Sequence, residues 1–525
     1  MKSVMKHDFS KVPSVNIPRS TFNRTHGYKS TFNSGYLVPF YVDEALPGDT
    51  FSCQTTMFTR LTTPIVPVMD NVFLETFYFA VPIRLVWDNF NRFNGEIIDP
   101  NDPNEQTDFL IPQLQSGQNG FDVGSLSDYF GLPINVPNLS VSSLWHRAYN
   151  LIYNEWFRDQ NLCSPARVNR ADGGDVAADF PLRRRGKRHD YFTSALPWAQ
   201  KGDSVGINLG GMIPVVGTTQ QLQFQDVTNN DMYPLNANND YSKFGHTLSP
   251  VGIKSVNLPR NPNNSRVFAD LSETTGITIN ALREAFQIQK MLEKDARGGT
   301  RYTEIIRSHF GVISPDSRLQ RPEYLGGSTD RIHFTPVQQT APTNEVTPQG
   351  NLAAFATASA VGKGFTKSFT EHCVIIGILN VRADLTYQDG IPRMFSRQTR
   401  YDFYWPSLAH LGEQEIKNKE IYAQGLPVDD EVFGYQERWA EYRYYPSKIT
   451  GLMRSKAPLS MDIWHLSQRF NSLPQLTSEF IEEKPPIARV LAVQNQPEFL
   501  LDCYIQLRCT RPMPVYSVPG LIDHF

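Results

Sequence analysis

Cysteine, long apolar stretches and a strong net charge are all scarce in this 525-residue sequence. Its five cysteines form no Cys-x-x-Cys pair, which argues against a disulfide framework or a zinc site and indicates reduced thiols in a cytoplasmic setting. The longest apolar run, residues 373–379, is far shorter than the roughly 20 residues that a membrane-spanning helix needs. The first twenty residues also lack the apolar core of a secretory signal. We therefore expect neither a membrane span nor secretion by that route.

Motifs for catalysis and cofactor binding are missing as well. The sequence has no glycine-rich phosphate loop, no Gly-x-Ser-x-Gly elbow and no His-Glu-x-x-His or EF-hand pattern, and its eleven histidines form no pair at metal-ligand spacing. The formal net charge of −3 excludes a chain that binds nucleic acid over its whole surface. The prediction is a protein that is not an enzyme and has no cofactor or metal.

Proline is abundant, with 37 residues spread along the chain beside 34 glycines and a 12% aromatic fraction. Evenly scattered proline interrupts helices and is excluded from central strands, so much of the chain should lie in ordered connections and extended arms. Hydrophobic residues make up 40% of the chain, which is enough for a core. This composition is typical of a globular protein built from strands and long loops.

Apolar residues mark the strands. Polar and apolar residues alternate over 51–61, 373–387 and 501–509, as in strands with one buried face, whereas 71–81 is apolar on both faces. Apolar residues recur three and four positions apart in three stretches, which predicts three helices. The first is capped by Ser142 or Ser143, the second begins at Asn280 and stops at the glycines at 298–299, and the third covers 304–310. Strong strands at both ends, separated by helices and loops, indicate one sandwich with long insertions, in which the first and last strands are neighbours.

These patterns predict the domain organisation. We expect an extended N-terminal arm over 1–50 and a single jelly-roll domain over 51–525. Residues 218–266, which hold nine asparagines and few apolar residues, should form a surface protrusion within it.

The densest charge feature is a basic segment followed by Tyr191 and Phe192, a combination that can grip phosphates and stack bases. Its charges are Arg183, Arg184, Arg185, Lys187 and Arg188. The alternative is that these side chains pair with carboxylates across a subunit interface, where arginine is also enriched. The aromatic segment 435–445 is more typical of a packed strand or helix at an interface.

Several strings resemble the major capsid proteins of gokushoviruses, a branch of the Microviridae. They are FNRTHGYKSTFNSGYLVPFYVDEALPGDTF at 22–51, KRHDYFTSALPWAQKG at 187–202, DARGGTRY at 295–302, SHFGVISPDSRLQRPEYLGG at 308–327 and RPMPVYSVPGLIDHF at 511–525. The central block is the most specific of these, and together the strings run over nearly the whole chain.

The resemblance implies an all-β fold with helical insertions: an eight-stranded antiparallel jelly roll of the viral capsid type with long inter-strand loops. It also implies a T=1 icosahedral shell around circular single-stranded DNA in the virion, assembled in the cytoplasm of a bacterial host with an internal scaffolding protein. The family's surface insertion would contact a host receptor, and we place it at 218–266. The residues expected to make that contact are Asn229, Asn230, Tyr233, Asn238 and Tyr241.

Two further functions are compatible with the residues alone. Jelly-roll sandwiches also occur in carbohydrate-binding or carbohydrate-cleaving proteins, although an enzyme of that kind needs paired carboxylates in a cleft. A single-strand DNA-binding protein is disfavoured by the net charge of −3. For a capsid, we expect the arm at 1–48 and the tail at 511–525 to lie against neighbouring subunits or the inner wall of the shell.

Overall fold

The computed structural model describes residues 17–97, 99, 101, 109–203, 205, 279–313, 319–345 and 347–516, together with four short strands between 215 and 269. The chain divides into two compact units. One comprises residues 1–199 and 295–525, and the other comprises residues 200–294.

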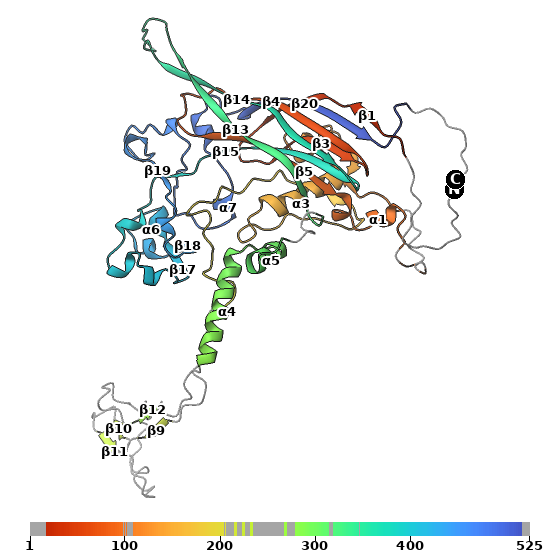
Figure 1. The fold of residues 1–525 in the computed structure, drawn as a ribbon. Coiled ribbons are helices and arrows are strands. Elements are labelled where there is room, and N and C mark those ends of the chain that lie inside the picture. Colours follow the sequence, from red (N-terminus) through yellow and green to blue (C-terminus); the bar gives the residue numbers. More distant parts are fainter. Residues whose placement is uncertain are drawn as a thin grey trace, which may run out of the picture. The chain divides into compact units, whose positions relative to one another are not determined.

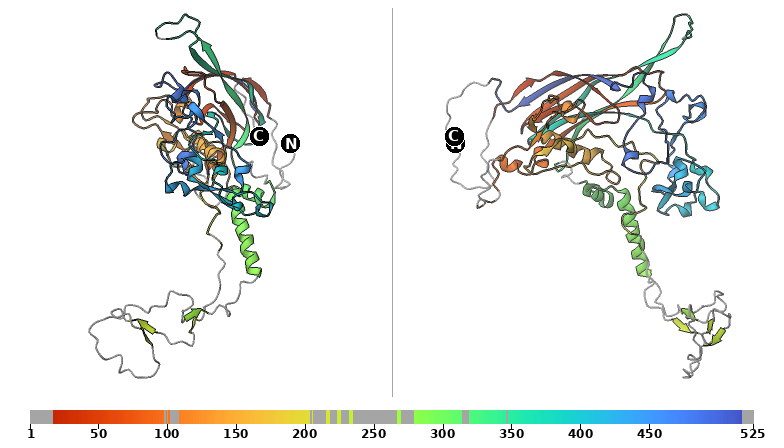
Figure 2. Two further views of the ribbon diagram at one scale, coloured as in Figure 1. Left: turned by 90° about the vertical axis from the view of Figure 1, so that its left-hand side faces the viewer. Right: turned by 180° about the vertical axis from the view of Figure 1, so that it is seen from behind.

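The first unit is built on one large antiparallel sheet (Figure 1). Its strands are β1 (Ser20–Asn23), β2 (His26–Phe32), β3 (Val38–Ala45), β4 (Thr50–Leu61), β5 (Val72–Pro82), β13 (Glu323–Gln338), β14 (Leu352–Ser368), β15 (Cys373–Ala383) and β20 (Phe499–Arg511). The order across the sheet is β1-β20-β4-β14-β13-β5-β15-β3, and β2 also pairs with β20. Because β1 and β2 follow each other along the same strand, they act as one interrupted edge strand, and the sheet has the eight positions expected of a jelly roll. The sheet curls into a half-barrel (Figure 2).

The first and last strong strands are neighbours, as predicted. β4 and β20 pair from Thr50 opposite Thr510 to Leu61 opposite Phe499. Alternate residues of β20 are buried along its length, because its side chains point in turn to the core and to the other face. Strands that are far apart in the sequence therefore share one core.

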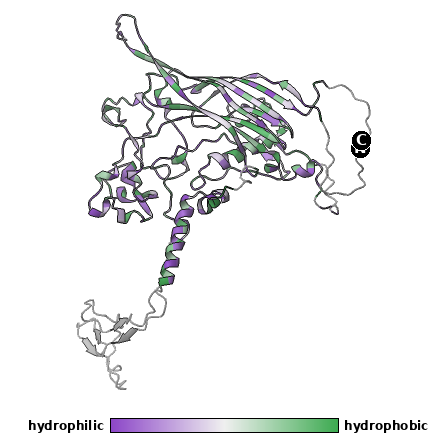
Figure 3. Cartoon of the chain, in the orientation of Figure 1, coloured by the Kyte–Doolittle hydropathy of each residue, from purple (hydrophilic) through white to green (hydrophobic). Residues whose placement is uncertain are grey.

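Two hydrophobic clusters cover opposite faces of β5 and β15. Leu74 and Ile375 belong to the cluster inside the half-barrel, whereas Phe79 and Ile376 belong to the second. The second cluster also contains Tyr149 and other residues of α3 (Leu144–Ile152). Hydrophobic residues are interspersed with hydrophilic ones over the strands of the large sheet (Figure 3). The prediction that residues 71–81 are covered on both faces is confirmed.

The N-terminal boundary expected at residue 50 is wrong. β1, β2 and β3 all pair within the large sheet, and Leu37, Val38 and Phe40 are buried in its cores. Residues 20–45 therefore belong to the fold and do not form a separate arm. Deleting residues 1–48 would remove both edge strands of the sheet, so such a deletion cannot leave an intact monomer.

The long hairpin of β13 and β14 was not expected from the sequence. β14 pairs with β13 on one side and with β4 on the other, so both strands lie in the middle of the sheet. Its buried positions include Ala354, Ala356, Ala358 and Ala360. An alternation built on alanine is too weak in hydrophobicity to mark a strand in a sequence.

The helices expected from the sequence are present. α3 begins after Ser143 and continues into a π-helical turn at Tyr153–Phe157, and α5 (Tyr302–Phe310) ends at Gly311, whose φ of 71° suits glycine. The other helices are α1 (Phe90–Phe93), α2 (Leu126–Tyr129), α4 (Ile279–Arg297), α6 (Asn418–Ile421) and α7 (Ser478–Ile481). No helix among the described residues is long and apolar enough to cross a membrane.

Smaller sheets complete the first unit. They join β6 (Gln113–Gln115) to β7 (Ser140–Ser142) and β8 (Asp175–Val176), β16 (Thr386–Tyr387) to β19 (Ser447–Lys448), and β17 (Glu413–Lys417) to β18 (Val432–Glu437).

The second unit includes residues 218–266, for which a surface protrusion stays a prediction. Its described strands are β9 (Val215–Gly217), β10 (Gln223–Gln225), β11 (Met232–Pro234) and β12 (Val267–Ala269). β9 pairs with β12 and β10 pairs with β11. Of the expected receptor-contacting residues, Tyr233 lies in β11, whereas Asn229, Asn230, Asn238 and Tyr241 lie outside the described residues.

Candidate functional site

The basic segment 183–188 lies between two other parts of the chain and bonds to both. The Arg185 amide donates to the carbonyl of Gly35 at 2.9 Å, and the Glu483 amide donates to the carbonyl of Arg185 at 2.8 Å. The Lys187 amide donates to the carbonyl of Ile481 at 2.7 Å. The segment therefore connects the start of β3 to the end of α7 by backbone pairing.

Arg185 and Arg382 share one buried carboxylate. Glu75, in the middle of β5, accepts from the guanidinium of Arg185 and from that of Arg382, the latter at 2.7 Å. Arg185 also lies over the ring of Phe77, 5.1 Å from its centroid. Because Glu75 and Arg382 are both buried, this triad holds the basic segment to the barrel by charge-assisted hydrogen bonds.

Lys187 and Glu483 are two further buried titratable groups, and their charges attract each other. The Lys187 ammonium donates to Gln468 Oε1 at 2.8 Å and to the carbonyl of Phe480 at 2.5 Å. Burial lowers the pKa of Lys187 to about 8, against the attraction of Glu483. Burial also raises the pKa of Glu483 to about 7, opposed by the positive charges of Lys187, Arg185 and Arg382. Desolvation thus favours the neutral forms of both groups.

This pair predicts a pH dependence of stability. The pKa of Glu483 in the folded protein, about 7, lies above its ordinary value of 4.5, so the folded state holds a proton that the unfolded chain has released. The free energy of unfolding should therefore fall as the pH rises from 4.5 to 7. The pKa of Lys187 is lowered from 10.5 to about 8, so the unfolding free energy should recover as the pH rises through that window.

Glu483→Gln should remove the fall but leave the rise. Urea titrations at about pH 5 and pH 7.5 should show a wild-type decrease larger than that of the variant by on the order of 2 kcal/mol. Parallel pH profiles for the two proteins would show that Glu483 does not titrate in this window.

The remaining basic side chains differ in their contacts and in their exposure to solvent. Arg184 lies over the ring of Tyr36, 3.9 Å from its centroid, and donates to the carbonyl of Glu483 at 3.1 Å. Arg183 lies over the ring of Tyr153 at 5.5 Å. The side chain of Arg188 is 57% exposed, and its guanidinium is 3.9 Å from an oxygen of Asp384.

The basic segment is therefore chiefly a connector within one chain. Arg185 binds a carboxylate of the same chain, and Lys187 binds a carbonyl of the same chain. Bonding within the chain is thus a role that the sequence did not suggest, in addition to contact with DNA or with another subunit. Contact of the segment with DNA stays a prediction, and Arg188 has the exposure that phosphate contact requires.

Another buried ion pair, between Arg147 and Asp175, was not predicted from the sequence. Arg147, in α3, is fully buried, and its Nε donates to Asp175 Oδ2 at 2.6 Å. Its Nη1 donates to the carbonyls of Val86 and Ala171 at 3.1 and 2.9 Å, and its Nη2 donates to the carbonyl of Gly173 at 3.2 Å. One side chain thus joins α3 to two loops. An arginine within an apolar helical pattern is the only signal in the sequence that could have found it.

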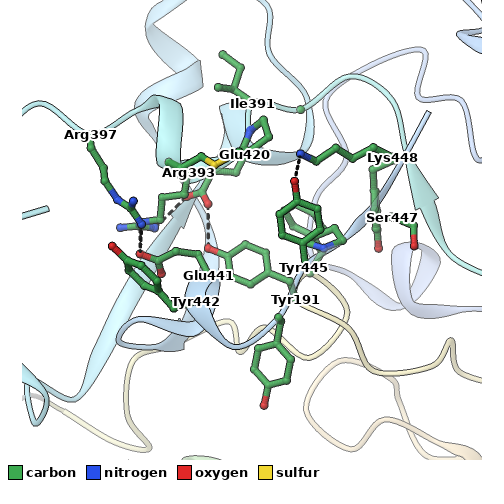
Figure 4. A pocket seen from close by; sticks show the side chains of 17 residues that line it. Tyr191, Ile391, Arg393, Arg397, Glu420, Glu441, Tyr442, Tyr445, Ser447 and Lys448 are labelled. Atoms are coloured by element: carbon green, nitrogen blue, oxygen red, sulfur yellow. Dashed lines mark hydrogen bonds and ion pairs between the residues drawn. The ribbon is translucent and has the colours of Figure 1, made fainter. Parts of the chain in front are cut away.

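An aromatic pocket of about 180 Å³ lies beyond the end of β15 (Figure 4). Its aromatic walls are Tyr191, Phe192, Tyr387, Tyr442, Tyr444 and Tyr445, and Met394 and Pro446 add to the apolar lining. Tyr191 is buried and donates to Glu420 Oε2 at 2.9 Å, whereas Tyr445 is 71% exposed at the surface. The pocket therefore has a fixed, hydrogen-bonded base and an exposed aromatic rim.

Carboxylates at the base of the pocket are paired with arginines. Glu420 accepts from Arg393 at 2.9 Å, and Glu441 lies 3.5 Å from the guanidinium of Arg397. Burial raises the pKa of Glu420, and the positive charge of Arg393 opposes that rise. The lining is consequently apolar at the wall and close to neutral in charge at the base.

Exposed aromatic residues continue around this pocket, and we call them with its rim the aromatic surface. They are Phe395, Tyr401, Phe403, Tyr404, Trp405, Tyr442, Tyr444 and Tyr445. Two of the nearby arginines lie over these rings, Arg397 over Tyr442 at 4.6 Å and Arg400 over Trp405 at 4.8 Å. Tyrosine, tryptophan and arginine together are the residues enriched at the centres of protein interfaces.

Other kinds of site find no support in the described part of the chain. No group of three or more metal-binding side chains occurs there. All five cysteines are free thiols, and those at 53, 373, 503 and 509 are buried in the barrel. Burial raises the pKa of Cys53, Cys373 and Cys503 to about 12, so these thiols are inert.

A curled antiparallel sheet with helical insertions places the chain in the jelly-roll class, which includes the shell proteins of many viruses. The family model described as "Capsid protein (F protein)" matches residues 10–521. The chain belongs to this family of capsid proteins.

Three relatives agree with this assignment along their whole lengths. The chain is 46% identical to "Capsid protein VP1" of Bdellovibrio phage phiMH2K, covering 99% of this chain and 98% of the relative. It is 44% identical to "Capsid protein VP1" of Chlamydia phage 1, with 99% and 98% covered, and 39% identical to that of Spiroplasma virus 4, with 98% and 97% covered. All three are gokushoviruses of the Microviridae, so the resemblance in the sequence is confirmed.

Proposed function

We propose that this capsid protein assembles with copies of itself into a T=1 icosahedral shell that encloses circular single-stranded DNA. The observation that carries the proposal is the match to VP1 capsid proteins over 99% of the chain. The relatives' names support a place in the virion and leave the carbohydrate-binding alternative without support. Assembly takes place in the cytoplasm of a bacterial host, with an internal scaffolding protein as a transient partner.

The second unit supplies the contact with a host receptor in this proposal. Its asparagine-rich stretch offers side-chain amides, which both donate and accept hydrogen bonds. The residues assigned to the contact remain Asn229, Asn230, Tyr233, Asn238 and Tyr241. Adsorption of particles to host cells should fall when these five are replaced by serine, and unchanged adsorption would remove the second unit from receptor binding.

DNA enclosure is tested by the content of purified particles. Full-length protein, expressed with its scaffolding partner in the presence of the viral genome, should give closed particles that protect circular single-stranded DNA from nuclease. Arg188→Ser should lower the protected DNA per particle, because it removes an exposed positive charge without touching the buried pairs. Lys29→Ser, which removes a charge on β2 that is 78% exposed, is the matched control. Equal DNA content in wild type and Arg188→Ser would exclude Arg188 as a phosphate contact.

A further inference from the structure

The chain after β20 is a proline-rich segment with exposed apolar side chains. β20 ends at Arg511, and the sequence continues as PMPVYSVPGLIDHF. Within its described part, Met513, Val515 and Tyr516 are exposed, and Tyr516 is 79% exposed. Prolines at 512, 514 and 519 fix φ near the polyproline II value, so little conformational freedom is lost when such a segment binds. We call residues 512–525 the tail.

The aromatic pocket has the chemistry that recognises such a segment. Grooves lined by aromatic side chains bind proline-rich segments, because flat rings pack against pyrrolidine rings and the extended backbone stays accessible to hydrogen bonds. Tyr442, Tyr444 and Tyr445 present these rings at the rim, beside Pro446. The Ser447 side chain lines the same rim and adds a hydroxyl.

The charges of the pocket favour an uncharged apolar ligand over nucleic acid. Both lining arginines, Arg393 and Arg397, are paired with Glu420 and Glu441. Lys448, the remaining cation of the lining, donates to the hydroxyl of Tyr445 at 2.6 Å. A site for single-stranded DNA needs a run of positive charges along the backbone track, whereas here only the single charge of Lys448 has no carboxylate partner in the lining.

The register of the sheet places the tail and the pocket at opposite ends of the barrel. Pairing across the strands puts Ala383, the last residue of β15, at the same end as Leu61 and Phe499. The pocket follows that end of β15, whereas the tail leaves from Arg511 at the other end of β20 (Figure 1).

A tail could reach the pocket of its own chain only by running back along the sheet. In polyproline II geometry the tail spans about 43 Å at 3.1 Å per residue, and β4, with 12 residues, already measures about 40 Å. A second copy placed head to tail brings its own tail to the pocket without this detour. Head-to-tail contacts form rings when the rotation between successive copies closes, and such rings surround the symmetry axes of an icosahedral shell.

We propose that the aromatic pocket binds the proline-rich tail, residues 512–525, of a second copy of the chain. The inference rests on the proposed self-assembly and names one contact within it. It assigns the rim tyrosines to recognition of the prolines and apolar side chains of the tail.

A labelled peptide tests the contact on the full-length, unassembled protein. A fluorescein-labelled peptide of residues 511–525 should bind saturably in a fluorescence anisotropy titration. Tyr445→Ala should weaken binding by about tenfold, because it removes a ring from the rim. Tyr302→Ala is the matched control, since Tyr302, at the start of α5, is 76% exposed but belongs neither to the lining nor to the aromatic surface. The peptide with its three prolines replaced by alanine should also bind more weakly.

The outcomes separate this contact from the proposed function. If wild type does not bind the peptide, or Tyr445→Ala binds it as tightly as wild type does, the contact is wrong even when the wild-type protein forms closed shells. If the peptide binds as expected but no shells form with the scaffolding partner present, the contact stands and the proposed shell function fails. A tail held by the pocket of its own chain would block the peptide, and so counts against the proposal.

Discussion

Replacing Arg147 with methionine should lower the free energy of unfolding by about 3–5 kcal/mol. The substitution leaves the buried Asp175 carboxylate without its partner and removes the donor to three backbone carbonyls. An uncompensated buried charge is more costly than a lost surface pair, because water cannot solvate it. Urea unfolding of the unassembled protein, followed by tryptophan fluorescence, measures the loss.

Two further variants establish the cause. Arg167→Ala removes an arginine that is 65% exposed and paired with Asp179, so it should cost less than about 1 kcal/mol. The double variant Arg147→Met with Asp175→Asn should regain part of the loss, since no unpaired charge then remains. Equal effects for Arg147→Met and Arg167→Ala would contradict the structural role of the buried pair.

Glu75→Gln should also destabilise the protein strongly, by about 3 kcal/mol. Glu75 is the shared acceptor for Arg185 and Arg382, and both cations lose their counter-charge when it becomes an amide. Since this triad holds the basic segment to the barrel, limited proteolysis should cut near residues 183–188 in the variant before the barrel strands are attacked.

Asp502→Asn serves as the matched control. Asp502 lies on β20 and pairs with Lys29 at 3.0 Å, with both side chains largely exposed. Its loss should change stability by well under 1 kcal/mol. If Glu75→Gln were as mild as Asp502→Asn, the triad would contribute nothing beyond an ordinary surface pair.

Strands in which polar and apolar residues alternate strongly could be predicted from the sequence. That the first and last of them are neighbours followed from the strand order of a jelly roll. The pairing of β4 with β20 is the clearest example, because both strands alternate large apolar and polar residues. β14 escaped detection because its inward positions are alanines, and β3 because Pro39 lies within it. Pro39 is tolerated there because β3 is an edge strand of the sheet, which leaves one row of donors unneeded.

The candidate site was harder to predict, because the role of each side chain depends on partners that lie far away in the sequence. The basic segment is visible as a run of charges, yet its acceptors Glu75 and Glu483 lie about 110 and 300 residues away in sequence. Lys187 is almost fully buried, which no local pattern indicates. The aromatic pocket likewise combines Tyr191 with residues near 390, 420 and 445, so only the fold brings it together.

The mass of the assembled particle tests the central claim most directly. Full-length protein expressed with its scaffolding partner should form uniform closed particles by negative-stain electron microscopy. Light scattering should then give about 3.6 MDa of protein, the mass of about sixty chains of 59.6 kDa in a T=1 shell. A stable monomer of 59.6 kDa under these conditions, or open sheets of indefinite mass, would contradict the account.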